Sequence, residues 1–149
     1  MIFFVLVFLV AAVSGLFPPG AWYDGLSKPD WTPPNWLFGP AWTVLYLLLA
    51  IAGWLIYSHA PGKSARLLWA GQLALNAAWS WLFFGLHQPG WALLDVMLMS
   101  ALSLALIVLL FKDVFAWSRL AGLVLIPYWA WVTFAAALNA SIWMRAGGA

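Results

Sequence analysis

Apolar residues form five long runs along the chain, separated by short stretches of polar residues, glycine and proline. The hydrocarbon layer of a bilayer is about 30 Å thick, and an α-helix needs roughly 20 apolar residues to cross it. Backbone groups in lipid must bond within their own segment, so each run is predicted to be a helix. The five predicted spans cover residues 2–17, 40–57, 65–86, 91–111 and 118–144. We therefore predict an all-α integral membrane protein, with residues 1–149 forming a single five-helix domain.

The composition supports this class of protein. Hydrophobic residues make up 66% of the chain and charged residues 7%, far from the values of soluble domains. The chain has no cysteine, which excludes disulfides, thiolate nucleophiles and cysteine-bound metals. A formal charge of +2, with the basic residues scattered, argues against nucleic-acid binding. The first seventeen residues lack a positive start, so we interpret them as a retained helix.

The basic residues predict an orientation. With five spans the termini lie on opposite sides, and the side that carries more lysine and arginine is expected to be cytoplasmic. The N-terminal side carries Lys63, Arg66, Lys112 and Arg119, and the other side carries Lys28 and Arg145. This split predicts a cytoplasmic N-terminus, and an external first loop, in a bacterial inner membrane.

The first long connection, WYDGLSKPDWTPPNWLFGPAW at residues 22–42, combines tryptophan with proline. Its prolines are Pro29, Pro33, Pro34 and Pro40. Proline fixes its own φ and pushes the preceding residue toward extended conformations. Long loops are either functional lids or disordered, and disordered segments are poor in aromatic residues. We therefore predict an ordered, non-helical lid.

The thirteen tryptophans are distributed unevenly between the two sides of the predicted bundle. An interfacial belt would be roughly balanced. Three lie toward the opposite side, Trp54, Trp69 and Trp117, and Trp129 and Trp131 lie near mid-depth. Eight lie near the first loop: Trp22, Trp31, Trp36, Trp42, Trp79, Trp81, Trp91 and Trp143. This excess predicts an indole-lined cavity under the loop, suited to a flat, mostly apolar ligand.

The third span has two faces. Ala70, Ala74 and Ala78 form a small-residue stripe, and such stripes favour close helix packing, so we predict a homodimer interface there. Gln72, Asn76 and Ser80 form a polar stripe about 200° away around the helix, which we expect to face inward. From the pattern alone, the amides of this polar stripe either bind a ligand or tie helices together.

The remaining polar residues offer little chemistry. Asp95 lies inside the fourth span, where it would complement the helix dipole or bond a neighbouring helix. His59 and His87 lie in different loops and cannot share a metal, so we predict no metal site. No nucleophile motif, phosphate loop or paired carboxylates occur. Pro127 should kink the fifth helix or interrupt its hydrogen bonds.

The order of several long motifs resembles the TspO/MBR family of tryptophan-rich sensory proteins, whose mitochondrial member is the translocator protein, or peripheral-type benzodiazepine receptor. The resemblance covers almost the whole chain. The motifs are WYDGLSKPDWTPPNW, PAWTVLY, GQLALNAAWSWLFFG, GWALLDVMLMS and PYWAWVTFAAALN.

The resemblance implies a five-helix bundle, commonly dimeric, that binds porphyrins, haem-like tetrapyrroles and benzodiazepine or isoquinoline-carboxamide compounds under its first loop. No obligatory cofactor is implied, because porphyrin or haem is the ligand. The family's pocket positions correspond to Trp22, Tyr23, Trp31, Trp42, Asn76, Trp91, Trp131, Ala135 and Leu138. This correspondence favours ligand contact for Asn76.

Two further expectations follow from the resemblance. The animal sterol motif has a tyrosine where LNASIWMR has Ala140, so we expect no specific cholesterol binding. Light-dependent breakdown of porphyrin has been attributed to bacterial members. Excited porphyrin beside indoles could react without acid–base machinery, so binding alone and photo-oxidative degradation both stay open, as does transport of the ligand.

Overall fold

The computed structural model of the protein describes residues 2–59 and 62–147, and all regular structure within those ranges is helical. The predicted connection SHAPGKS is described except for Ala60 and Pro61, which lie outside these ranges. The helices are α1 (Ile2–Gly15), α2 (Ala21–Asp24), α3 (Asn35–His59), α4 (Lys63–Ser80), the π-helical segment η1 (Trp81–Gly85), α5 (Pro89–Lys112) and α6 (Ala116–Arg145).

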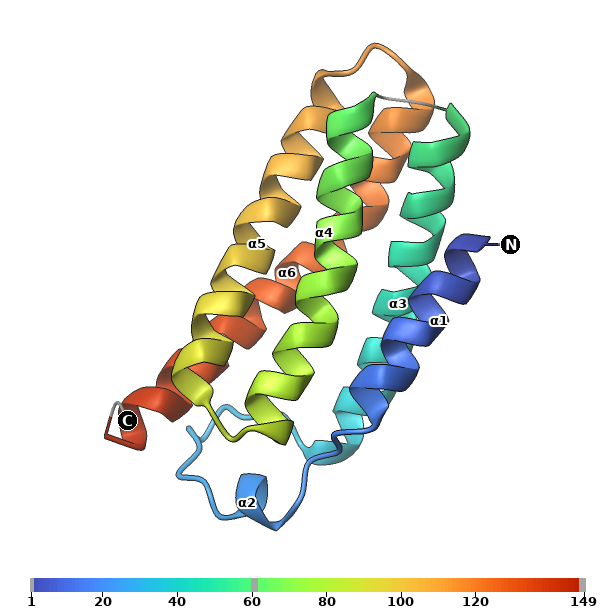
Figure 1. Cartoon of the computed structure of the whole chain (residues 1–149). Helices are drawn as coiled ribbons and strands as arrows, with labels where there is room; N and C mark the ends of the chain where they lie inside the picture. The colour runs from blue at the N-terminus through green and yellow to red at the C-terminus, as the bar shows by residue number, and fades with distance from the viewer. Residues whose placement is uncertain (1, 60–61, 148–149) are drawn as a thin grey trace.

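The long helices stand side by side in one bundle (Figure 1). Helix α5 packs against α6 and α4, while α3 packs against α6 and α1. The end of α3, the start of α4 and the α5–α6 connection lie at one end of the bundle, and the loop carrying α2 lies at the other, beside the α4–α5 turn (Figure 1). Helix α1 covers only part of the length of α3 (Figure 1).

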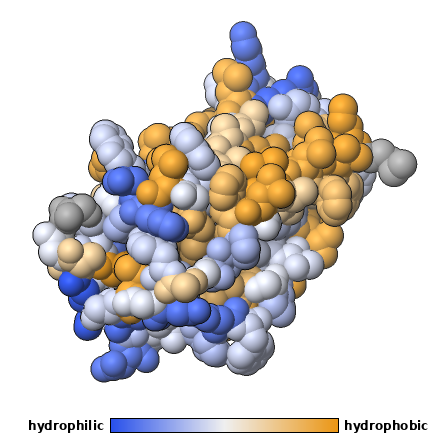
Figure 2. Space-filling model, turned by 60° about the horizontal axis from the view of Figure 1, so that its bottom comes forward, coloured by the Kyte–Doolittle hydropathy of each residue, from blue (hydrophilic) through white to orange (hydrophobic). Residues whose placement is uncertain are grey.

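The surface agrees with a membrane protein. Helices α3, α5 and α6 are long and apolar enough to cross a bilayer. Helix α1 is apolar but has 14 residues, and α4 has 18 residues but lower hydropathy. Figure 2 shows hydrophilic residues over the loop end and a hydrophobic band along the flank of the bundle. The all-helical part of the predicted fold class is thus confirmed. Three of the described helices are long and apolar enough to span a membrane.

Trp69 joins three helices in the half of the bundle away from the loop. Its side chain is 2% exposed, and its indole N–H donates to the Leu49 carbonyl of α3 at 2.9 Å. The Phe3 ring of α1 and the Tyr57 ring of α3 meet the indole edge-on, with centroids 5.8 and 5.6 Å away. The close approach of α4 to α3 requires Gly53, because a Cβ there would fall on the indole ring.

Helix α3 begins at Asn35, five residues before the predicted start, and it contains Pro40. The prediction of a start at residue 40 was wrong because it treated every proline as a boundary. Pro40 is the sixth residue of α3, so its ring removes one hydrogen bond, the one to the Trp36 carbonyl. The extended restriction imposed by Pro33 and Pro34 ends where the helix begins.

Pro127 likewise does not interrupt its helix. Helix α6 is continuous from Ala116 to Arg145 through Pro127. Proline lacks an N–H, so the Leu123 carbonyl has no donor from residue 127. The predicted interruption of the hydrogen bonds is therefore confined to one bond, and the helix persists on both sides of it.

The third predicted span, residues 65–86, is two kinds of helix in the structure. Helix α4 ends at Ser80 and η1 follows, with the Leu86 N–H donating to the Trp81 carbonyl at 2.8 Å, five residues back. A π-turn holds one residue more than an α-turn and shifts the following side chains around the axis. Gly85 ends this turn, and a Cβ there would lie 2.9 Å from the Phe17 ring.

The substitution Gly53→Ala tests the contact between α3 and α4. The added methyl group must displace Trp69, so we expect a loss of about 1–3 kcal/mol in the free energy of unfolding in detergent. Gly39→Ala on the same helix is the matched control, because a Cβ at that position would meet nothing within 4 Å. The control should be neutral or stabilising, since alanine favours helix over glycine. Equal stability of both variants would contradict the tight contact.

Candidate functional site

A cavity of about 300 Å³ lies beneath the loop, bounded by α1, α3, α6, the α4–η1 segment and α2. Its wall is mostly apolar and aromatic, which is typical of small-molecule sites. The residues that line it are Ala11, Ser14, Gly15, Phe17, Pro18, Pro19, Tyr23, Phe38, Gly39, Trp42, Tyr46, Trp79, Ser80, Phe83, Phe84, Trp131, Phe134, Ala135, Leu138, Asn139 and Ile142.

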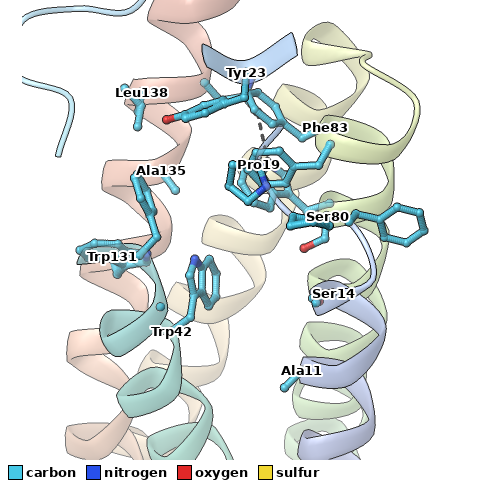
Figure 3. Close-up of a pocket in the computed structure, with 18 of the residues that line it drawn as sticks. Ala11, Ser14, Pro19, Tyr23, Trp42, Ser80, Phe83, Trp131, Ala135 and Leu138 are labelled. Carbon is cyan, nitrogen blue, oxygen red and sulfur yellow. Dashed lines mark hydrogen bonds between the residues drawn. The ribbon is translucent and has the colours of Figure 1, made fainter. Parts of the chain in front are cut away.

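Five of the nine predicted ligand residues come together around this cavity. They are Tyr23, Trp42, Trp131, Ala135 and Leu138. Figure 3 shows them on three elements, with Trp42 on α3, the last three on α6, and Tyr23 on α2 above the cavity. Ser14 and Ala11 of α1 lie on the opposite side (Figure 3). Sequence positions more than a hundred residues apart therefore form one wall.

Three predicted tryptophans do not line the cavity. Trp22 stacks on His87, with ring centroids 4.4 Å apart, and meets Phe83 edge-on. Trp31 is 51% exposed and lies over Phe134, with centroids 5.8 Å apart. Trp91 is 64% exposed on α5, one position before the fully buried Ala92. Neighbouring positions on a helix point about 100° apart, so burial of Ala92 turns Trp91 outward.

Asn76, the fourth residue absent from the lining, is buried behind the cavity wall. Its side chain is 2% exposed and lies between two tyrosines. The Tyr46 hydroxyl donates to Asn76 Oδ1 at 2.7 Å, and Asn76 Nδ2 donates to the Tyr128 hydroxyl at 3.3 Å. Asn76 of α4 thus joins α3 and α6 by hydrogen bonds. Its bond with Tyr46, which lines the cavity, connects it to the cavity wall.

The two faces predicted for the third span are present on α4. Gln72, Asn76 and Ser80 are all buried, as expected for the polar stripe. Ala70 and Ala74 are exposed and Ala78 is half-buried, so the alanine stripe faces outward over most of its length. Use of the alanine stripe as a dimer interface stays a prediction.

Several lining residues were not singled out from the sequence. Tyr46 lies one helical turn after Trp42, a spacing that could have identified it. Ser14 is a polar residue in an otherwise apolar run, and that isolation was a usable signal. Trp79 donates through its indole N–H to Asn139 Oδ1 at 3.2 Å, and Asn139 Nδ2 donates to the Pro89 carbonyl at 2.8 Å. These two bonds join segments that are far apart in the sequence, so no pattern of neighbouring residues could have predicted them.

The connection over residues 22–42 is ordered, as predicted, but it is not wholly non-helical: residues 35–42 belong to α3, and α2 adds one helical turn at Ala21–Asp24. Lys28 holds this turn: its ammonium group donates to the carbonyls of Tyr23 at 2.5 Å, Asp24 at 3.2 Å and Leu26 at 3.4 Å. The same ammonium lies 4.5 Å from the centre of the Tyr23 ring. Burial, and secondarily the Asp24 carboxylate, raise the pKa of Tyr23, so its phenol stays neutral at physiological pH.

Asp95 and the two histidines lie apart from one another. Asp95 is the seventh residue of α5, and its Oδ2 atom is buried with no hydrogen-bond partner in the described part of this chain. Of the two roles expected for Asp95, a bond to a neighbouring helix is therefore not made by this atom. His59 stacks on Trp117 and His87 stacks on Trp22. Among residues 2–59 and 62–147, no group of three or more potential metal ligands comes together.

Comparison with known proteins finds one family over almost the whole chain. Residues 3–144 match the family model described as TspO/MBR family. The chain is 42% identical to Protein CrtK of Rhodobacter capsulatus over 95% of its own length and 89% of that protein. It is 40% identical to the translocator protein of Homo sapiens, covering 82% of this chain and 73% of the human one. It is 38% identical to the tryptophan-rich sensory protein of Cereibacter sphaeroides, over 87% of this chain and 79% of that protein.

Proposed function

Since the chain belongs to the TspO/MBR family, we propose that it is a membrane receptor or sensor whose cavity binds porphyrins beneath the loop. The ligands are protoporphyrin IX, haem-like tetrapyrroles and flat drug-like compounds of the benzodiazepine or isoquinoline-carboxamide type. Binding would serve the regulation or transport of tetrapyrroles. The observation that carries this proposal is the set of three indoles, Trp42, Trp79 and Trp131, around one apolar cavity.

The chemistry of the wall supports a flat aromatic ligand. Aromatic rings prefer offset-stacked or edge-to-face contacts, and indoles offer large faces for both. Five phenylalanine rings, of Phe17, Phe38, Phe83, Phe84 and Phe134, line the same space. Polar lining side chains are few, and several are already paired: Trp79 bonds Asn139, and Tyr46 bonds Ser14. A ligand therefore gains most from apolar contact and little from charge.

We further propose that all five long helices cross the membrane. Helix α4 and η1 together form a continuous helical segment from Lys63 to Gly85, 23 residues long by these bounds. That length matches a bilayer, and the polar side chains of Gln72, Asn76 and Ser80 are buried. The distribution of lysine and arginine supports a cytoplasmic N-terminus in a bacterial inner membrane.

Protoporphyrin IX binding can be followed by quenching of tryptophan fluorescence in detergent. We expect saturable quenching, and we expect Trp131→Leu to weaken the affinity about tenfold, because one aromatic contact is worth roughly 0.5–1.5 kcal/mol beyond area burial. Trp91→Phe is the control, since Trp91 lies outside the cavity lining. Its affinity should equal that of the parent protein.

The same measurements include the outcomes that would contradict the proposal. Circular dichroism and size-exclusion profiles must first match those of the parent protein, because truncation of a packed aromatic residue also costs stability. Equal weakening by Trp131→Leu and Trp91→Phe would locate the ligand on the outer surface. Linear, non-saturating quenching would show that the protein has no specific binding site for the porphyrin.

A second candidate function is photo-oxidative degradation of the bound porphyrin, with dioxygen as the oxidant. The proximity of three indoles to the ligand space favours it, because indoles are electron-rich. We expect a defined product formed over many turnovers in light, and its loss in Trp42→Phe with binding retained. If an unrelated tryptophan-rich membrane protein causes equal loss of porphyrin, the loss is non-specific photosensitised damage and the protein does not catalyse it.

We propose that two copies of this chain form a homodimer through the alanine stripe. Ala74 is exposed on the outer face of α4. Small residues allow close approach of two helices in lipid, and a bulky side chain prevents it. We expect Ala74→Trp to convert the dimer to a monomer in detergent, measured by light scattering. Ala105→Trp on an exposed face of α5 is the control. A dimer that survives the change at Ala74 would point to another surface.

A further inference from the structure

An open groove lies on the outer side of the bundle between α3 and α6. Its lining is apolar throughout and consists of Pro33, Pro40, Ala41, Val44, Leu45, Pro127, Ala130, Trp131 and Phe134. Pro40 and Val44 of α3 and Pro127 and Ala130 of α6 are exposed, so the groove opens outward. Both helices are long and apolar enough to cross a bilayer, and in a bilayer this side of the groove faces the hydrocarbon.

The groove and the cavity share part of one wall. Of the described residues, Trp131 and Phe134 alone line both spaces, and each is half-buried. Their rings contact each other, with centroids 5.5 Å apart. Phe38 of the facing helix meets Trp131 edge-on, with centroids 6.2 Å apart. Aromatic rings from α3 and α6 therefore close the space between the groove and the cavity.

The contact between α3 and α6 is held without directional bonds. Interhelical side-chain hydrogen bonds of α3 go to α1 and α4, and those of α6 go to α4 and α5; within residues 2–59 and 62–147, none joins α3 to α6. By contrast, Ser100 and Thr133 join α5 to α6 at 2.8 Å. Separation of α3 from α6 therefore leaves no polar side chain unpaired, and an unpaired buried polar group is the main cost of opening a helix contact.

Both helices also carry a proline on the groove. Pro40 of α3 and Pro127 of α6 line it, and each lies inside its helix. A proline removes one backbone hydrogen bond, and sharp bends in helices occur mostly at proline. The two helices can therefore bend more easily beside the groove than elsewhere along their length.

Trp31 of the loop contacts the same aromatic rings from above. It is 51% exposed and lines neither the cavity nor the groove. Its ring meets Phe134 edge-on, with centroids 5.8 Å apart. Trp31 thus restricts the movement of one of the two side chains that separate the cavity from the groove.

We propose that the contact between α3 and α6 is a lateral portal, through which a flat apolar ligand passes from the bilayer into the cavity when Trp131 and Phe134 move aside. The inference rests on the proposed function, since the portal leads to the same cavity. Such a ligand concentrates in the bilayer, because transfer of apolar surface out of water is favourable. Trp31 is a positioning residue of the portal, and it holds Phe134 in the closed arrangement.

The substitution Ala130→Phe tests the portal by filling the groove, since Ala130 lines the groove and not the cavity. A ligand uses a portal in both directions, so we expect association and dissociation of protoporphyrin IX each to slow about tenfold, with the dissociation constant unchanged. Ala137→Phe is the matched control. Ala137 is exposed seven residues further along the same face of α6, and it lines neither space.

Both rates can be measured by tryptophan fluorescence on the protein in lipid vesicles. Association is followed as quenching after addition of protoporphyrin IX, and dissociation as recovery after addition of excess empty vesicles. An equilibrium titration gives the dissociation constant. The control variant reports any step that precedes the portal, such as transfer of porphyrin between vesicles, because that step is the same for both variants.

The substitution Trp31→Ala tests the closed arrangement from the opposite direction. Loss of its contact with Phe134 should raise both rates roughly two- to tenfold, the factor that corresponds to one aromatic pair, with the dissociation constant unchanged. Trp36→Ala is the control, because Trp36 is 72% exposed and lines neither space. A general loss of stability would not raise both rates in the same proportion.

Each contrary outcome has a distinct meaning. Unchanged rates in Ala130→Phe would show that the ligand enters elsewhere and would overturn the portal. A weaker dissociation constant with unchanged association would place bound ligand in the groove, and this too would overturn the portal. Equal effects of Trp31→Ala and Trp36→Ala would overturn the role of Trp31. Absence of saturable protoporphyrin IX binding in the parent protein would overturn the proposed function itself.

Discussion

The structure depends on one constraint: a polar group inside a membrane must find its hydrogen-bond partner within the protein, because lipid offers none. The backbone meets this constraint by forming helices over most of the described chain. Buried side chains meet it by bonding across helices. The indole of Trp69 bonds to the Leu49 carbonyl, and the amide of Asn139 bonds to the Pro89 carbonyl. These bonds fix which helices are neighbours, since apolar contact in lipid does not by itself specify a partner.

The same constraint gives the bundle two different halves. In the half away from the loop, α4 approaches α3 closely, with Trp69 over Gly53. In the loop half, the helices enclose a cavity instead. The π-turn at Trp81–Gly85 lies at this end and presents Phe83 and Phe84 to the cavity. Rigid packing in one half thus supports an open space in the other, and the loop held by Lys28 covers that space.

The cavity combines an aromatic wall with a few polar atoms at its edge. Its aromatic wall is formed by residues that contact one another, as Trp131 contacts Phe38 and Phe134 with ring centroids 6.2 and 5.5 Å apart. Rings arranged in this way leave faces and edges that a flat apolar molecule can contact. The polar atoms at its edge are oriented by bonds that begin deep in the bundle. Asn76 thus contacts the wall through Tyr46 without lining the cavity itself.

The sequence by itself determined the class of the protein, the number and approximate extent of the long helices, the two faces of α4 and the presence of an aromatic cavity under the loop. These features follow from the period of the helix and from composition, which are local properties. Only the tertiary structure decided that Trp91 faces outward, that Asn76 is behind the wall, and that Ser14, Tyr46 and Asn139 reach the cavity. The rotation of each helix about its axis settles those placements, and contacts between distant segments set that rotation. The start of α3 before Pro40 and the π-turn after Ser80 were also missed, because neighbouring helices stabilise local geometry that sequence propensity disfavours.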